Sequence, residues 1–296
     1  MDGVSFTVGE GEMLALVGES GCGKTTTAQS VMRLVEPDAG TIRFRGQELI
    51  GLSNRALRPL RRQMQLIYQD PYESLDPRFR VRSTVEEPLL VHGVGSRPER
   101  RRLVEEALAR AGLTPPELYV DRFPHELSGG QRQRVAIASS LVLDPELLVA
   151  DEPVSMLDVS VRAGVLRLLD GLRQEGLGIL MITHDLSTAA HFANRIAVMY
   201  LGRIVEEGPA REVVRNPQHP YTKALLSVVP KRDPHERSRP QILQGETPDP
   251  THIPAGCRFH PRCPIAIPEC KQVDPELRRT AGGRSPEHTA ACIRAW

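Results

Sequence analysis

The residues whose spacing most directly indicates chemistry form a phosphate-binding loop near the N-terminus. The segment Gly18 to Thr25 fits the pattern G-x-x-x-x-G-K-[ST] and lies between an apolar run ending at Val17 and a helical pattern opening near Lys24. Glycines let backbone N–H groups curl around phosphates, and a helix N-terminus favours anions. We predict that Lys24 neutralises phosphate charge and that Thr25 binds Mg²⁺. The predicted nucleotide-binding residues of this loop are Gly18, Glu19, Ser20, Gly21, Cys22, Gly23, Lys24, Thr25 and Thr26.

Two carboxylates end another apolar run, Leu147 to Ala150. Asp151 is expected to hold the Mg²⁺ ion, directly or through water, and Glu152 to polarise the attacking water as a general base. An apolar run ending in Asp-Glu is common by itself. The upstream phosphate loop is what favours the metal-binding interpretation over a plain strand end.

A Ser-Gly-Gly turn, Leu127 to Gln131, comes shortly before that run and precedes a helical pattern starting near Arg132. Such a turn at a helix N-terminus presents N–H groups and a hydroxyl, and so predicts a second phosphate-binding surface made of Ser128, Gly129, Gly130 and Gln131. Ordinary helix capping is the alternative.

Short apolar runs alternate with helical patterns, which predicts an α/β fold with a parallel sheet. Helices are predicted after Gly23, across Glu99 to Ala111 and across Val159 to Leu172. The predicted strands are Met13 to Val17, Met64 to Tyr68, Leu147 to Ala150, Ile179 to Thr183 and Ile196 to Tyr200.

Two changes in sequence pattern and composition along the chain suggest its domain organisation. Residues from about 71 to 141 are poor in strand patterns and are predicted to form a helical insertion, while prolines become frequent after Pro209. We therefore predict one α/β domain over residues 1–208, with a helical insertion at about 71–141, and a loop-rich extension over 209–296.

Composition narrows the classes of partner. A formal net charge of +1 over 296 residues gives no global basic field, so nucleic acid is not an expected partner. No apolar run reaches the ~20 residues that span a membrane, which favours a peripheral location.

Six segments, in this order along the chain, resemble the motifs of ABC ATPases. The phosphate loop is similar to Walker A and Leu147 to Glu152 to Walker B, while Leu127 to Gln131 resembles the ABC signature. The other three are Gln69 as the Q-loop glutamine, Ser155 to Asp158 as the D-loop and His184 as the switch histidine. The resemblance implies a P-loop NTPase with a RecA-like parallel sheet, helices on both faces and an ABC helical subdomain.

The resemblance also implies roles and partners. Gln69 would touch metal and water, His184 the γ-phosphate, and Asp158 the nucleotide at the interface between two cassettes paired head to tail. The expected partners are a paralogous ATPase subunit, two integral-membrane permease subunits and, indirectly, an extracytoplasmic solute-binding protein. The chain would then lie at the cytoplasmic face of the cell membrane.

The C-terminal extension resembles that of dipeptide and oligopeptide importer ATPases. The similarity rests on the segments from His219, Gly245 and Gly256, and on the Gln69 to Arg78 segment. It implies ATP-driven peptide uptake. The alternatives are import of nickel or another small solute, a non-transport ABC ATPase, and a redox-sensing module in which ATPase activity is secondary.

Four of the five cysteines lie in this extension: Cys257, Cys263, Cys270 and Cys292. Their spacing is unlike the paired C-x₂-C of zinc ribbons, and four thiolates suffice for a [4Fe-4S] cluster. The family resemblance favours that cluster, with Zn²⁺ and four unliganded cysteines as alternatives. His260 and His288 are less favoured as substitute ligands.

Two positions depart from the family pattern. ABC cassettes usually have an aromatic residue upstream of Walker A that stacks on adenine, whereas Phe6 is the sole aromatic residue before Gly18. We therefore expect the N-terminal strand of the family to be missing. Met156 also replaces the small residue usual in the D-loop, without removing a catalytic group.

Overall fold

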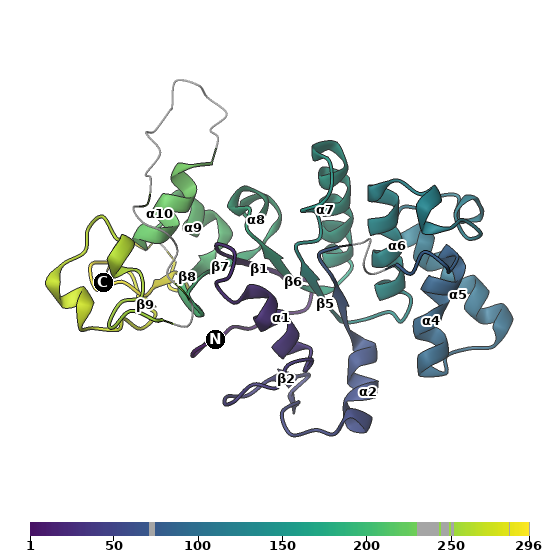
Figure 1. Cartoon of the computed structure of the whole chain (residues 1–296), viewed down its shortest axis with the longest axis horizontal. Coiled ribbons are helices and arrows are strands. Elements are labelled where there is room, and N and C mark those ends of the chain that lie inside the picture. The colour runs from purple at the N-terminus through teal and green to yellow at the C-terminus, as the bar shows by residue number, and fades with distance from the viewer. Residues whose placement is uncertain (71–74, 230–242, 244–248, 250–251, 284, 296) are drawn as a thin grey trace. The chain divides into compact units, whose positions relative to one another are not determined.

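The computed structural model describes residues 1–70, 75–229, 243, 249, 252–283 and 285–295 (Figure 1). It contains two compact units. The first unit comprises Met1–Thr7, Leu14–Thr27 and Thr183–Trp296, and the second comprises Val8–Met13 and Ala28–Ile182.

Three parallel strands form the centre of the second unit. β4 (Met64–Ile67), β5 (Leu147–Asp151) and β6 (Gly178–Thr183) lie side by side in that order. Their interior is apolar because the strands are rich in Leu, Ile and Val, and every residue of β6 is buried. All three strands agree with the sequence prediction to within one residue at every boundary.

Helices make up most of the rest of the second unit. α4, α5 and α6 pack on one another in the described part of the predicted helical insertion, from residue 75 onward. Residues 71–74, with which the predicted insertion begins, lie outside the described residues. The elements are α2 (Asn54–Gln63), α4 (Val81–His92), α5 (Arg97–Arg110), η1 (Pro116–Leu118), η2 (Pro124–Glu126), α6 (Gly129–Leu141), α7 (Val159–Gln174) and the hairpin β2 (Arg43–Phe44) with β3 (Gln47–Glu48).

The strands of the first unit are parallel at one end and antiparallel at the other. β1 (Met13–Val17) pairs in parallel with β7 (Arg195–Tyr200), while β8 (Arg203–Pro209), β10 (Thr289–Ala290) and β9 (Arg278–Arg279) follow as antiparallel strands. The sheet is therefore mixed rather than parallel throughout. The cause is local: Leu201 and Gly202 join β7 to β8 with φ of 42° and 80°, as a two-residue hairpin turn requires.

Short helices complete the first unit. They are α1 (Lys24–Val31), which continues into the second unit, α8 (Leu186–Phe192), α9 (Ala210–Arg215), α10 (Pro220–Ser227), η4 (His260–Arg262) and η5 (Pro268–Lys271). Within the described part of the chain, no helix is both long and apolar enough to cross a bilayer.

An aromatic cluster packs the extension over residues 209–296, here called the C-terminal region, against β7. The rings of Tyr200, Tyr221 and Phe259 lie 4.8 to 5.4 Å apart between centroids, and all three side chains are fully buried. Aromatic pairs at this spacing add to the free energy of burial. The C-terminal region therefore has a core of its own against β7 despite its many prolines.

A buried carboxylate joins the same region to β8. Glu206 is fully buried and accepts hydrogen bonds from Gln218 N (2.7 Å) and His219 N (2.8 Å), and its Oε1 lies 2.7 Å from His288 Nε2. These contacts compensate the cost of burying a carboxylate. His288 is thus held by Glu206 and does not line the cysteine pocket described below.

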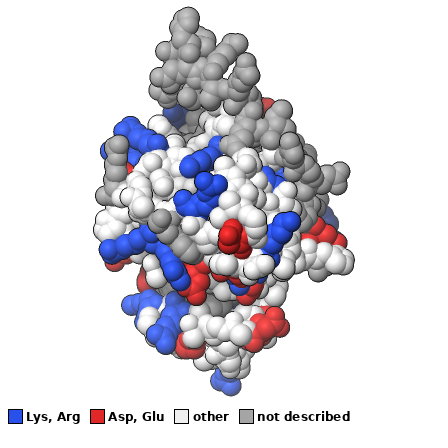
Figure 2. Space-filling model, turned by 90° about the vertical axis from the view of Figure 1, so that its left-hand side faces the viewer, with Lys and Arg blue, Asp and Glu red and all other residues white. Residues whose placement is uncertain are grey.

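Charged side chains on the outer face of this region are interspersed rather than gathered by sign (Figure 2). Arg203, for example, bonds to both Asp2 and Asp274, and Arg278 pairs with Glu276. Exposed pairs of this kind contribute little stability individually.

Candidate active site

The predicted phosphate loop connects β1 to α1 within the first unit. Gly18 follows the strand directly, and a Cβ atom there would lie 2.3 Å from the Met199 carbonyl oxygen, so only glycine fits. Lys24 is 6% exposed, and its Nζ donates to the carbonyl oxygens of Gly18 (2.8 Å) and Glu19 (2.9 Å). The Lys24 side chain therefore lies across the loop that is predicted to bind phosphate.

The remaining residues of the loop differ in exposure. Ser20, Gly21, Thr25 and Thr26 are exposed, as a ligand in the loop would require. Cys22 is buried, its Sγ lies 3.9 Å from Lys24 Nζ, and burial raises the pKa of its thiol. Its sulfur is therefore a packing group, and its carbonyl oxygen accepts a hydrogen bond from Gly202 N at 2.8 Å.

At the end of β5 the second unit brings two predicted catalytic residues together. Gln69 Nε2 lies 3.3 Å from Glu152 Oε2, and Asp151 is 5% exposed. Glu152 has a φ of 44°, rare for a residue with a side chain, and its N–H donates to Ile182 O at 2.9 Å. Backbone of this kind persists where neighbouring structure holds it, and it is concentrated at functional sites.

The predicted second phosphate-binding surface lies at the N-terminus of α6, also in the second unit. Ser128 is the N-cap: its Oγ accepts from Gln131 N (3.3 Å), and Gln131 Oε1 accepts from Ser128 N (2.9 Å). Gly129 is half-buried and Gly130 is buried. The turn is thus a capping box, but the Ser128 hydroxyl is exposed and keeps its proton for a further acceptor.

Two predicted residues remain, one in each unit. Asp158 is exposed at the N-cap of α7, two residues after the exposed Met156. His184 is exposed in the first unit and precedes Asp185, the N-cap of α8, whose carboxylate accepts from Ser187 N (2.9 Å) and Thr188 Oγ1 (2.6 Å). Burial works to raise the pKa of Asp185, but these bonds hold it below its ordinary value, so the cap is charged at neutral pH.

Sequence reasoning missed two side chains that contact the phosphate loop. Tyr221 accepts a hydrogen bond from Glu19 N, and Arg262 donates to the Glu19 carboxylate. Both follow the loop by some two hundred residues. No local pattern indicates such a contact; the only signal was that both belong to the C-terminal segments that resemble peptide importers.

The four C-terminal cysteines converge on one pocket, which His219 and His260 also line. All five cysteines of the chain are free thiols. Burial, and then the other three thiols, raise the pKa of Cys257 to about 11. Convergence of four sulfurs fits a thiolate-bound metal group, although no three described Cys, His, Asp or Glu side chains already stand in the geometry of a metal site.

Comparison with known proteins decides the family. Residues 1–155 match the family described as "ABC transporter", which is more than half of the chain. The oligopeptide transport ATP-binding protein AppF of Bacillus subtilis is 48% identical over 297 residues, covering 99% of this chain and 88% of that protein. The chain belongs to the ABC transporter family. It is therefore an ABC-type ATPase, and the resemblance of its six motifs is confirmed at the level of the family.

Solved ABC cassettes share the fold. The ATP-binding cassette MJ0796, in a dimeric post-hydrolysis state bound to ADP and Pi, is 32% identical with a TM-score of 0.63, covering 70% of this chain and 89% of that one. cbiO1 of Clostridium perfringens, part of the ABC transporter complex cbiONQ, is 31% identical with a TM-score of 0.66, covering 72% of this chain and 83% of that one.

A second family assignment covers the C-terminal part of this ABC ATPase. Residues 205–270 match "Oligopeptide/dipeptide transporter, C-terminal region". This range includes Cys257, Cys263 and Cys270 and ends before Cys292. The Gly245 to Pro248 segment that contributed to the predicted resemblance lies outside the described residues.

Proposed function

We propose that this ABC ATPase is the ATP-hydrolysing subunit of an importer that energises the uptake of dipeptides or oligopeptides. The observation that carries the proposal is the match of residues 205–270 to the C-terminal region of oligopeptide and dipeptide transporters. The 48% identity to AppF over nearly the whole chain supports it. We assign residues 1–208 to the ATPase domain and 209–296 to the extension.

In the proposed mechanism the phosphate loop changes partners when ATP binds. Lys24 leaves the carbonyl oxygens of Gly18 and Glu19 for phosphate oxygens, which are stronger acceptors because they are charged. The exposed residues Ser20, Gly21, Thr25 and Thr26 supply N–H groups to the phosphates. The loop thus exchanges internal hydrogen bonds for bonds to the nucleotide.

The proposed hydrolysis assigns a role to each predicted catalytic residue. Thr25, Asp151 and Gln69 are the proposed ligands of Mg²⁺, which neutralises charge on the phosphates. Glu152 takes a proton from the attacking water, and the bond from Gln69 positions its carboxylate. His184 contacts the γ-phosphate.

The proposed assembly completes the site with a second cassette. Ser128, Gly129, Gly130, Gln131 and Asp158 face the nucleotide held by that partner, for which the exposed Ser128 hydroxyl is suited. MJ0796 is dimeric in its ADP-bound structure, which supports such pairing. We propose a paralogous ATPase subunit as the partner, with two permease subunits and a solute-binding protein completing a transporter at the cytoplasmic face of the membrane.

We further propose that Cys257, Cys263, Cys270 and Cys292 hold a [4Fe-4S] cluster, with Zn²⁺ as the alternative. Their convergence on one pocket supports this assignment. Metal binding would favour the thiolate forms, whereas burial raises the pKa of the free thiols of Cys257, Cys263 and Cys292. The group would stabilise a region in which prolines prevent long helices and strands.

Transport into proteoliposomes tests the proposed function. The chain is co-expressed with the membrane and ATPase subunits encoded beside it, and uptake of labelled dipeptide, labelled oligopeptide and Ni²⁺ is compared in the presence of ATP. We expect ATP-dependent peptide uptake that Glu152→Gln abolishes. Uptake of Ni²⁺ without peptide uptake would favour the alternative importer class, and ATPase activity without any uptake would favour a non-transport ABC ATPase.

A further inference from the structure

The C-terminal region contacts the phosphate loop at Glu19, the first variable residue of the loop. Tyr221 Oη accepts a hydrogen bond from Glu19 N at 2.9 Å. Arg262 donates from Nη1 to Glu19 Oε2 (2.8 Å) and from Nη2 to Glu19 Oε1 (3.2 Å). One residue of the loop is therefore held through both its backbone and its side chain.

These two contacts are built into the core of the first unit. Arg262 has a side chain only 8% exposed, and its guanidinium carbon lies 6.0 Å from the centre of the Tyr200 ring. Tyr221 is fully buried in the aromatic cluster, and burial raises the pKa of its phenol, so the hydroxyl stays neutral and able to accept. A two-point guanidinium–carboxylate pair among buried rings is more rigid than a surface ion pair.

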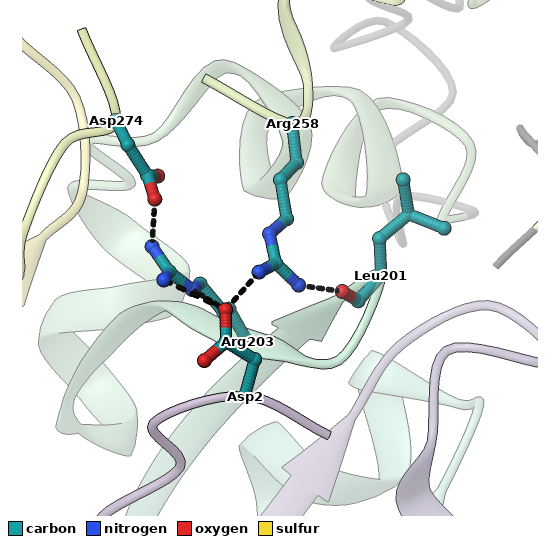
Figure 3. A network of polar contacts seen from close by, with 5 residues as sticks. All are labelled: Asp2, Leu201, Arg203, Arg258 and Asp274. Carbon is teal, nitrogen blue, oxygen red and sulfur yellow. Dashed lines mark hydrogen bonds and ion pairs between the residues drawn. The ribbon is translucent and has the colours of Figure 1, made fainter. Parts of the chain in front are cut away.

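A second support reaches the loop at Cys22, where Gly202 N donates to Cys22 O at 2.8 Å. The neighbouring Leu201 O accepts a hydrogen bond from Arg258, which also pairs with Asp2 (Figure 3). Arg258 and Arg262 both come from the segment between Cys257 and Cys263. One short stretch of the C-terminal region therefore supports the loop directly at Glu19 and, through the β7–β8 turn, at Cys22.

We propose that Tyr221 and Arg262 are positioning residues for ATP binding, through which the C-terminal region sets the affinity of the phosphate loop. Arg262 neutralises the Glu19 carboxylate, which would otherwise repel the polyphosphate. Tyr221 holds the peptide that joins Gly18 to Glu19, and the carbonyl of that peptide, Gly18 O, is one of the two that hold Lys24. The inference concerns ATP binding alone and does not depend on the transported solute or on the occupant of the cysteine pocket.

The test compares ATP affinity among variants of the full chain by titration with a fluorescent ATP analogue and Mg²⁺. Arg262→Gln removes the positive charge that is paired with the Glu19 carboxylate beside the loop, so we expect the Kd to rise about tenfold. Glu19→Gln combined with Arg262→Gln removes that carboxylate, and we expect its Kd to return to within about threefold of the wild type. Simple loss of packing would not be rescued by the second substitution.

Tyr221→Phe isolates the hydroxyl because the ring stays in the aromatic cluster. We expect the KM for ATP to rise about threefold with kcat unchanged. Arg195→Gln is the matched control: Arg195 also forms a partly buried pair, with Glu207, but in the β7–β8 ladder. It should lower the melting temperature and leave the Kd for ATP within about twofold.

Three results would overturn the proposal. They are an unchanged Kd in Arg262→Gln, a double variant that binds ATP as weakly as Arg262→Gln alone, and a loss of ATP affinity in Arg195→Gln equal to that in Arg262→Gln. Near-UV circular dichroism on each variant establishes that the chain has folded before its affinity is compared.

Discussion

At the scale of single residues, Lys24 stabilises the phosphate loop through hydrogen bonds, and the same side chain is proposed to bind the phosphates of ATP. Lys24 Nζ bonds to two carbonyl oxygens of its own loop, so its charge is solvated within the protein while the side chain is buried. Replacement of these bonds by charged phosphate oxygens keeps the ammonium group satisfied throughout binding. The loop can therefore bind and release nucleotide without leaving a buried charge unpaired.

The Cys22 thiol provides a pH-dependent test of this loop. Burial raises the pKa of Cys22, and the nearby Lys24 only partly offsets the effect. We expect iodoacetamide to label Cys22 at pH 7.5 at least about tenfold more slowly in the native chain than in urea, and faster as the pH rises. Mass spectrometry of the Cys22 peptide measures both rates. Equal rates at pH 7.5 would contradict the buried position.

The same shift has a consequence for stability. Because the pKa of Cys22 is higher in the folded chain than in the unfolded chain, its contribution to stability is fully present below the unfolded value of about 8.5. That contribution is lost as the pH rises through the folded value. Cys22→Ala should therefore flatten the fall in melting temperature above about pH 8.5.

At this scale the candidate catalytic side chains have local signals in the sequence, whereas the side chains that support the phosphate loop do not. Lys24, Glu152 and Gln69 belong to short patterns in which residue type and spacing indicate the chemistry. Tyr221 and Arg262 reach the loop only because the chain returns to β7 after some two hundred residues, and neither has a local signal. The assigned roles of the site residues remain predictions.

At the scale of elements, the turn between β7 and β8 determines where the antiparallel part of the sheet begins. Gly202 has a φ of 80°, and a Cβ atom there would lie 3.3 Å from Met1 Cα. We expect Gly202→Ala to lower the free energy of unfolding by about 1 to 2 kcal/mol because alanine is strained at this φ.

Gly171 is the matched control for this substitution. It lies within α7, and no atom lies within 4 Å of the position its Cβ would take. Gly171→Ala should raise the free energy of unfolding by about 0.5 to 1 kcal/mol through better helix propensity. Urea denaturation measures the change in the free energy of unfolding, with its sign, for both variants. A change of the same sign in both would contradict the assigned backbone conformations.

The sequence indicated the buried strands better than the exposed elements. β1, β5 and β6 are continuous apolar runs because neighbouring strands or helices cover them, and such runs are easily recognised. β8 was missed because Glu206 and Glu207 interrupt its apolar pattern, and Glu206 is tolerated in the interior only through partners that come from elsewhere in the chain. α2 was missed because only Leu57 is buried on it and Pro59 lies inside it.

At the scale of the whole molecule, the cysteine pocket is the feature that distinguishes the C-terminal region from the ATPase domain. We expect anaerobically purified chain to contain about four irons and a broad absorption near 400 nm, both lost in Cys257→Ser. Loss of the metal should lower the melting temperature because metal binding stabilises the folded form. About one zinc per chain would favour the alternative metal, and a metal-free chain with an unchanged melting temperature would contradict both.

Some parts of the molecule are recognisable in the sequence because their composition differs from that of their neighbours. The helical insertion and the Pro-rich extension are visible as changes in composition, whereas the packing of the extension on β7 and β8 depends on side-chain contacts between distant segments. Tyr200 and Phe259, for example, are unremarkable in sequence and meet edge to face in the core.

The most direct test is ATP turnover by the purified chain together with the proposed paralogous ATPase and permease subunits, compared between the wild type and Glu152→Gln. We predict Mg²⁺-dependent hydrolysis by the wild type and at least about a hundredfold lower kcat in Glu152→Gln with ATP binding retained, because the general base is lost while the phosphate loop is intact. The matched variant Glu146→Gln, at an exposed carboxylate just before β5, should retain the wild-type rate. Undiminished turnover in Glu152→Gln, or no turnover by the wild-type assembly, would contradict the central claim.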